Sequence, residues 1–252
     1  MARLPLFVIT VVLLGSPIPV VHAADAGITV GVLAFRGDDL ARQRWEPTTN
    51  YLSTSLPGYS FKLLPLDLHE MNDALVRGDI DFILTNPGNY VELEARYGVT
   101  RIATLKNVRQ GRAYVEFGAV IFTRAARTDI RELGDLKHAS FAAVDPNAFG
   151  GFEMAWRELA EAGLDPFRDL RVLKFVGFPQ DEVVYQVRDG KADAGTVRTD
   201  VLERMASRGL IDLDEFRVLN PRITGNYSPP ILTSIQSEPC SASSGEILVS
   251  RA

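Results

Sequence analysis

Short apolar segments alternate with amphipathic helical segments along most of the chain, and this alternation limits the fold more than any other feature. The helical segments show apolar residues at helical spacing, as in Leu68, Met71 and Leu75. The expected strands cover residues 28–33, 59–66, 81–84, 99–105, 113–123, 140–144, 171–176 and 192–197. Repeated strand–helix units of this length favour an α/β fold with mostly parallel sheets flanked by helices.

One strand–helix junction occurs twice. Gly78 and Asp81 precede an apolar strand, and Gly190 and Asp193 precede another at the same spacing, 112 residues further on. The repeat predicts two lobes of like topology, the alternative being chance recurrence of a common helix–glycine–strand junction. We interpret Asp81 and Asp193 as turn residues rather than catalytic acids, because aspartate is favoured in such turns.

Residues 1–24 have the layout of a secretory signal peptide. Arg3 precedes an apolar run over residues 4–14, and small residues stand at positions 21 and 23, where cleavage would follow. An uncleaved anchor fits less well, because the run is shorter than the roughly 20 residues that span a bilayer. We therefore expect export to the periplasm, and no membrane span elsewhere.

Composition and motifs argue against several functions. The net charge of −5 disfavours a nucleic-acid partner, and the single cysteine, Cys240, excludes an internal disulfide. His22 lies in the signal segment, and His69 and His138 have no histidine or cysteine at metal-ligand spacing. Nucleophile-elbow, phosphate-loop and dinucleotide motifs are missing from the sequence. We expect a binding protein with no metal, cofactor or catalytic residues; an exported hydrolase on an α/β scaffold is the alternative.

Polar loops at four strand ends are the candidate ligand site. In open α/β sheets ligands bind beyond the carboxyl ends of the strands, and helix N-termini attract anions. Arg36 and Arg198 stand close to predicted helix starts, where arginine opposes the helix dipole, and this indicates a ligand role. The alternatives are plain turns, helix starts and core aromatics. The candidate residues are Arg36, Thr85, Asn86, Tyr90, Tyr114, Asn147, Phe149, Gly150, Thr196, Arg198 and Thr199.

Several segments carry a family resemblance when taken together. They are residues 31–35, residues 78–82 with Asn86-Pro87-Gly88, and residues 130–137 with the following strand and Asp145-Pro146. In this order they resemble the phosphate, phosphite and phosphonate substrate-binding family, from about residue 28 to about residue 218. The resemblance implies a type II periplasmic binding fold, with two lobes joined by crossover strands, a solute in the cleft and no chemistry on that solute.

A narrower resemblance points to sensing. Residues 84–94 and 195–205 are similar to the periplasmic sensor domains of histidine kinases of the tetrathionate-sensing type. Two positions depart from phosphonate binders: the turn at residues 147–151 lacks hydroxyl side chains, and Gln180 stands where a histidine often follows a strand. These differences indicate a different set of ligand contacts, since a fixed polar contact set is what rejects wrong ligands.

The sequence thus predicts four regions. Residues 1–24 are the signal peptide, 25–110 lobe 1, 111–218 the crossover strand and lobe 2, and 219–252 a divergent or truncated tail. The expected function is that of a periplasmic solute-binding protein or sensor domain, serving ABC-type transport or two-component signalling. Its expected partners are a small anionic or polar solute and a membrane permease or sensor kinase. The tail, Ser/Pro-rich from about residue 228, belongs either to a stand-alone binder or to a truncated or frameshifted sensor gene, which we favour.

Overall fold

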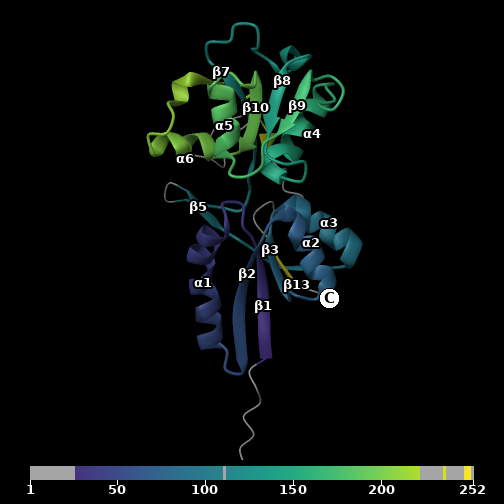
Figure 1. The fold of residues 1–252 in the computed structure, drawn as a ribbon, viewed down its shortest axis with the longest axis vertical. Coiled ribbons are helices and arrows are strands. Elements are labelled where there is room, and N and C mark those ends of the chain that lie inside the picture. Colours follow the sequence, from purple (N-terminus) through teal and green to yellow (C-terminus); the bar gives the residue numbers. More distant parts are fainter. Residues whose placement is uncertain (1–25, 110–111, 222–234, 237–246, 251–252) are drawn as a thin grey trace, which may run out of the picture.

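The computed structural model describes residues 26–109, 112–221, 235–236 and 247–250, and these form two lobes stacked along the long axis of the molecule (Figure 1). The predicted signal peptide and Cys240 lie outside the described residues. Among the helices of the described residues, none has the length and apolar character needed to cross a bilayer.

Lobe 1 is built on a five-stranded sheet with the order β2-β1-β3-β13-β4. The parallel part comprises β1 (Ala26–Leu33), β2 (Tyr59–Leu66) and β3 (Phe82–Thr85). Strand β13 (Ile247–Ser250) runs antiparallel between β3 and β4 (Thr100–Thr104). Helix α1 (Asp38–Ser55) covers one face, while α2 (Leu68–Arg77) and α3 (Pro87–Tyr97) cover the other (Figure 1).

Lobe 2 is built on a sheet with the order β11-β7-β10-β8-β9, and β12 (Ile235–Gln236) pairs with β7. Its strands are β7 (Gly118–Arg124), β8 (Ser140–Ala143), β9 (Val172–Phe175), β10 (Ala194–Arg198) and β11 (Phe216–Val218). The helices are α4 (Met154–Glu161), α5 (Asp181–Arg188) and α6 (Val201–Ser207). Shorter turns are η1 (Leu133–Leu136), η2 (Phe149–Glu153) and η3 (Leu213–Glu215).

The two sheets share one topology, which confirms the prediction of two like lobes. Strands β1, β2, β3 and β4 occupy the places that β8, β9, β10 and β11 occupy in lobe 2. The fifth place is taken by an antiparallel strand in each sheet, β13 in lobe 1 and β7 in lobe 2. Each sheet is therefore mostly parallel, as predicted.

The repeated Gly-x-x-Asp junction has the same structural role in both lobes. The backbone N–H of Asp81 donates to the Thr29 carbonyl at 2.9 Å, and its carboxylate accepts from the Thr29 N–H at 2.8 Å. Asp193 makes the same pair of contacts with Ser140, at 3.0 and 2.8 Å. Each aspartate thus ties the start of one strand to the neighbouring strand, which agrees with the turn role inferred from the sequence.

One local prediction differs from the structure. Residues 113–123 were expected as one strand, but the chain forms a hairpin of β5 (Asn107–Arg109) and β6 (Arg112–Tyr114), then turns before β7. The buried Phe117 occupies this turn. Before α4 the chain forms the wide turn η2, in which Gly150 packs close to the backbone of Gly118 and Gly151 packs close to the side chain of Val144.

Candidate functional site

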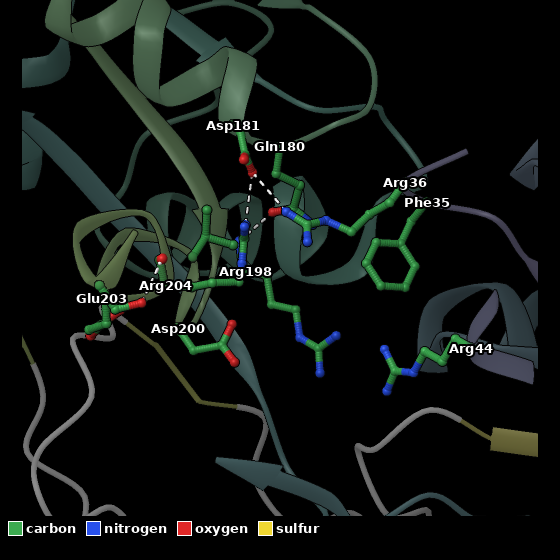
Figure 2. Close-up of a pocket in the computed structure, with 11 residues that line it drawn as sticks. Phe35, Arg36, Arg44, Gln180, Asp181, Arg198, Asp200, Glu203 and Arg204 are labelled. Atoms are coloured by element: carbon green, nitrogen blue, oxygen red, sulfur yellow. Dashed lines mark hydrogen bonds and ion pairs between the residues drawn. The ribbon is translucent and has the colours of Figure 1, made fainter. Parts of the chain in front are cut away.

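A cavity of ≈ 440 Å³ lies between the lobes, at the carboxyl ends of the central strands (Figure 2). Its walls combine residues of both lobes with an unusual number of charged side chains. They are Phe35, Arg36, Arg44, Gln180, Asp181, Arg198, Asp200, Val201, Glu203, Arg204 and Ser207. We call this space the arginine cavity.

Strand ends, helix starts and helix interiors place these residues. Arg36 follows β1 in lobe 1, and Arg198 is the last residue of β10 in lobe 2. Asp181 begins α5, which follows β9, and Arg204 lies in α6. Because the carboxyl ends of parallel strands meet at one edge of a sheet, side chains far apart in the sequence converge here.

A carboxylate bridges two of the arginines across the lobe boundary. The Oδ1 atom of Asp181 lies 2.8 Å from Nη2 of Arg204 and 3.4 Å from Nη2 of Arg36 (Figure 2). Burial raises the pKa of Asp181, but the two guanidinium groups outweigh it and hold that pKa below its usual value. The pKa of Arg36 is lowered by burial and by the neighbouring Arg204. The ion pair joins lobe 1 to lobe 2.

Two further guanidinium groups point toward one space from opposite lobes (Figure 2). Arg198 is held by its backbone N–H, which donates to Oε1 of Gln180 at 2.7 Å, and its guanidinium lies 3.8 Å from the centre of the Phe117 ring. Arg44 of α1 donates to Oδ1 of Asn107 at 3.4 Å. Arginine forks match the paired oxygens of carboxylates, phosphates and similar groups, so the space between Arg44 and Arg198 suits an oxyanion.

A smaller aromatic recess adjoins the arginine cavity. It measures ≈ 40 Å³ and shares Phe35, Gln180 and Arg198 with the larger space. Phe117 and Phe149 meet edge to face there, with ring centroids 5.3 Å apart. The cleft therefore combines a charged chamber with an apolar wall, so it offers a small ligand both charged and apolar contacts.

The structure brings six of the predicted site residues to these two spaces. Arg36 and Arg198 line the arginine cavity, and the recess is lined by Thr85, Asn86, Phe149 and Gly150, together with Arg198. The two predicted residues that lobe 1 contributes to the recess, Thr85 and Asn86, also organise the start of α3. The hydroxyl of Thr85 donates to Oδ1 of Asn89 at 2.8 Å, and Oδ1 of Asn86 caps the helix by accepting from the Asn89 N–H at 2.9 Å.

Four predicted residues line neither space. Tyr90 is buried in the core of lobe 1, and its hydroxyl donates to Glu94. Asn147 is exposed in a turn, with its N–H donating to Asp145 at 2.8 Å. Thr196 is fully buried within β10, and the hydroxyl of Thr199 accepts from the Gly118 N–H at 3.0 Å.

Tyr114 ends β6, but its side chain lies outside what the structure describes.

Sequence reasoning missed Arg44, Asp181 and Arg204. Asp181 could have been predicted as a site residue, because it follows β9 and therefore belongs to a further loop at the same edge of the sheet. Arg44 and Arg204 lie inside helices, where a polar residue looks like an ordinary solvated position. In the part of the chain that the structure describes, no group of three His, Cys, Asp or Glu residues is placed to hold a metal ion.

Comparisons with known proteins agree with this architecture. A family described as the periplasmic substrate-binding protein of phosphonate ABC transporters matches residues 30–237. The tetrathionate sensor histidine kinase TtrS of Salmonella typhimurium (strain LT2) is 39% identical over 215 residues, which make up 84% of this chain. The chain spans 36% of the length of that kinase.

Solved structures show the same fold at low sequence identity. PhnD1 of Prochlorococcus marinus, in complex with methylphosphonate, superposes with a TM-score of 0.66 at 15% identity, over 90% of this chain and 77% of that one. A binding-protein component of an ABC phosphonate transporter from Pseudomonas aeruginosa gives a TM-score of 0.66 at 16% identity, over 90% and 69% of the two chains. The predicted two-lobed, type II periplasmic binding fold is confirmed.

Proposed function

Because the chain belongs to the family of periplasmic substrate-binding proteins of phosphonate ABC transporters, we propose that it binds a small oxyanion between its lobes and performs no chemistry on it. The observation that carries this proposal is the convergence of arginines from both lobes on one cavity, with Arg36 and Arg44 from lobe 1 and Arg198 and Arg204 from lobe 2. A ligand held from both sides favours the closed arrangement, because it gains its full set of contacts only there.

The ligand that fits best is a sulfur oxyanion such as tetrathionate. The kinase that shares 39% identity with this chain is named for tetrathionate. Tetrathionate carries a sulfonate-type group at each end, and Arg44 and Arg198 face the same space from opposite lobes. The turn at residues 147–151 lacks the hydroxyl side chains expected of a phosphonate binder, which favours a sulfur oxyanion over phosphonate.

The role we propose is that of an exported sensing domain. The signal-peptide layout of residues 1–24 and the periplasmic family support export. The similarity to a segment of a sensor histidine kinase supports signalling, while the transporter family supports delivery to a permease as the second candidate role. A chimaera in which this chain replaces the matching segment of the Salmonella kinase separates the two: tetrathionate-dependent autophosphorylation supports sensing, and a silent but ligand-binding chimaera supports delivery.

Calorimetric titration of the purified protein tests the binding proposal. Tetrathionate should bind with 1:1 stoichiometry and more tightly than sulfate or methylphosphonate. Arg198→Ala should weaken binding by about 1.5–3 kcal/mol, the usual contribution of a hydrogen bond to a charged group. Arg157→Ala is the matched control, because Arg157 lies on α4 and pairs with Glu161 at 2.8 Å. Equal affinity of the wild type and Arg198→Ala would remove this arginine from the site.

A further inference from the structure

A second contact between the lobes involves residues that do not line the arginine cavity. Glu153 ends η2 in lobe 2, and its carboxylate packs against Gly88 in the first turn of α3 in lobe 1. The fit is close enough that a Cβ atom at position 88 would collide with the carboxylate. A glycine at this position thus lets an ionisable side chain from the other lobe enter the contact.

The charged groups around Glu153 are mostly acidic. Glu92 of α3 acts on it from lobe 1, and Asp145, which precedes η2, acts on it from lobe 2. The negative charge of Glu92 is partly neutralised, since its carboxylate lies 2.9 Å from Nη1 of Arg96 and accepts a hydrogen bond from Asn72 at 3.2 Å. Asp145 lies 3.5 Å from Nε2 of His69 across the lobe boundary. The contact brings like charges together when Glu153 is ionised.

Burial raises the pKa of Glu153 to about 7, and Glu92 and Asp145 contribute to the same shift. The N-terminus of α3 acts in the opposite direction, because it favours the charged form. Once the lobes separate, the carboxyl group loses its burial against lobe 1 and moves away from Glu92, so its pKa falls toward the ordinary value of about 4.3. Closing the lobes between these two values therefore takes up a proton.

We propose that lobe closure is coupled to protonation of Glu153, so that the protein holds its ligand more tightly in acidic surroundings. This inference rests on the proposed function, in which the ligand is held by the closed form. The ion pair between Arg36 and Asp181 crosses the same boundary but joins groups of opposite charge, so it favours closure at every neutral or mildly acidic pH. Glu153 makes the free energy of lobe closure depend on pH.

The sign follows from the raised pKa of the closed form. Protonated Glu153 favours closure, so affinity is highest below about pH 4.3, falls as the pH rises toward about 7, and is level above that value. The carboxyl group of Glu153 keeps some exposure to solvent. We therefore expect roughly a tenfold loss of affinity between pH 5 and pH 8, which is less than the complete pKa difference between the two forms would give.

Calorimetric titration with tetrathionate at pH 5, 6, 7 and 8, at constant ionic strength, tests the coupling. Sulfonate-type groups are strong acids, so the charge of the ligand does not change over this range. The wild type should lose roughly tenfold in affinity. Glu153→Gln should bind at pH 8 nearly as tightly as the wild type at pH 5, and His69→Gln measures the share due to histidine. Glu161→Gln, on the exposed side of α4, should keep the wild-type profile.

A wild-type profile that is level from pH 5 to pH 8, or a full slope retained in Glu153→Gln, overturns the inference while leaving anion binding intact. If tetrathionate does not bind at any pH, lobe closure can be measured by small-angle scattering of the ligand-free protein. The inference then predicts a smaller radius of gyration at pH 5 than at pH 8 in the wild type, and a small radius at both in Glu153→Gln. Identical radii for the wild type at the two pH values contradict it.

Discussion

The two lobes share a strand order but differ in how well they are packed. In lobe 2 two hydrophobic clusters cover the two faces of the sheet, and residues such as Phe122 and Phe141 are completely buried. In the described part of lobe 1 one cluster fills the face under α2 and α3. The other face, under α1, has a partly open apolar cavity of ≈ 370 Å³ among the described residues. Equal topology therefore does not give equal packing.

The loose packing of lobe 1 has its cause in α1. Of its 18 residues only Ala41 and Thr49 are buried, and Pro47 interrupts its hydrogen bonding. Trp45 and Leu52 line the apolar cavity together with sheet residues and do not fill it. Since α1 also carries Arg44, the less tightly packed lobe holds one wall of the arginine cavity, and we expect ligand binding to stabilise lobe 1 more than lobe 2.

Truncating one leucine in each lobe should give the largest difference. Leu202→Ala empties a fully buried position of lobe 2 and should lower the free energy of unfolding by about 2–5 kcal/mol. Leu52→Ala enlarges an existing cavity in lobe 1 and should cost less than about 1.5 kcal/mol, because fewer contacts are lost. Denaturant unfolding measures both, and equal losses would show that the lobes are equally well packed.

The repeated aspartates offer a matched pair of substitutions. Asp193 accepts from the N–H and hydroxyl of Ser140 and also pairs with Arg127 and Arg171, whereas Asp81 is exposed and accepts from the Thr29 N–H. Asp193→Asn should cost roughly 2 kcal/mol, and Asp81→Asn about 0.5–1 kcal/mol, since the first leaves more charged partners uncompensated. Thermal unfolding of the two variants measures both losses of stability. A larger loss in Asp81→Asn than in Asp193→Asn would contradict this prediction.

The same aspartate should make lobe 2 sensitive to acid. Burial raises the pKa of Asp193, but hydrogen bonds from Ser140 and Arg127 outweigh it and hold the pKa well below its usual range. A lowered folded-state pKa contributes stability that is present above about pH 4 and is lost as the pH falls further. Between pH 5 and pH 2 the Asp193→Asn variant should therefore lose less stability than the wild type. Parallel acid-unfolding curves would contradict this.

Adding volume should have opposite effects in the two lobes, though smaller ones. Ala103 lines the apolar cavity of lobe 1, so Ala103→Leu should raise the free energy of unfolding by about 0.5–1 kcal/mol. Ala143 is fully buried in lobe 2, so Ala143→Leu should cost about 1–3 kcal/mol through overpacking. Melting temperatures from calorimetry show whether each substitution raises or lowers stability. If Ala103→Leu destabilises the protein, the cavity of lobe 1 is closed in solution.

Local patterns in the sequence were enough to predict the architecture. Strand–helix alternation and the repeated Gly-x-x-Asp junction led to two like lobes, because both are local signals with a direct structural cause. Strand β13 was not predicted, since four residues after a Ser-rich stretch carry little periodicity and its pairing with β3 is distant in the sequence. Pairing between strands that are distant in the sequence cannot be predicted from the residues of one strand alone.

The candidate site was only partly predictable for the same reason. Residues at strand ends, such as Arg36 and Arg198, converge because the sheet edge is shared, and this rule can be applied without coordinates. Arg44 and Arg204 reach the cavity from helix interiors, which requires knowing the helix orientation. Tyr90 was misplaced for a related reason, because one helical position decides whether a side chain faces the cleft or the core.

A crystal structure of the protein with tetrathionate tests the central claim, that the lobes close on an oxyanion held by arginines of both. The account predicts the anion in the arginine cavity, with its oxygens about 2.7–3.0 Å from the guanidinium nitrogens of Arg44 and Arg198. An anion bound to one lobe alone, or at a site remote from these two arginines, would contradict it.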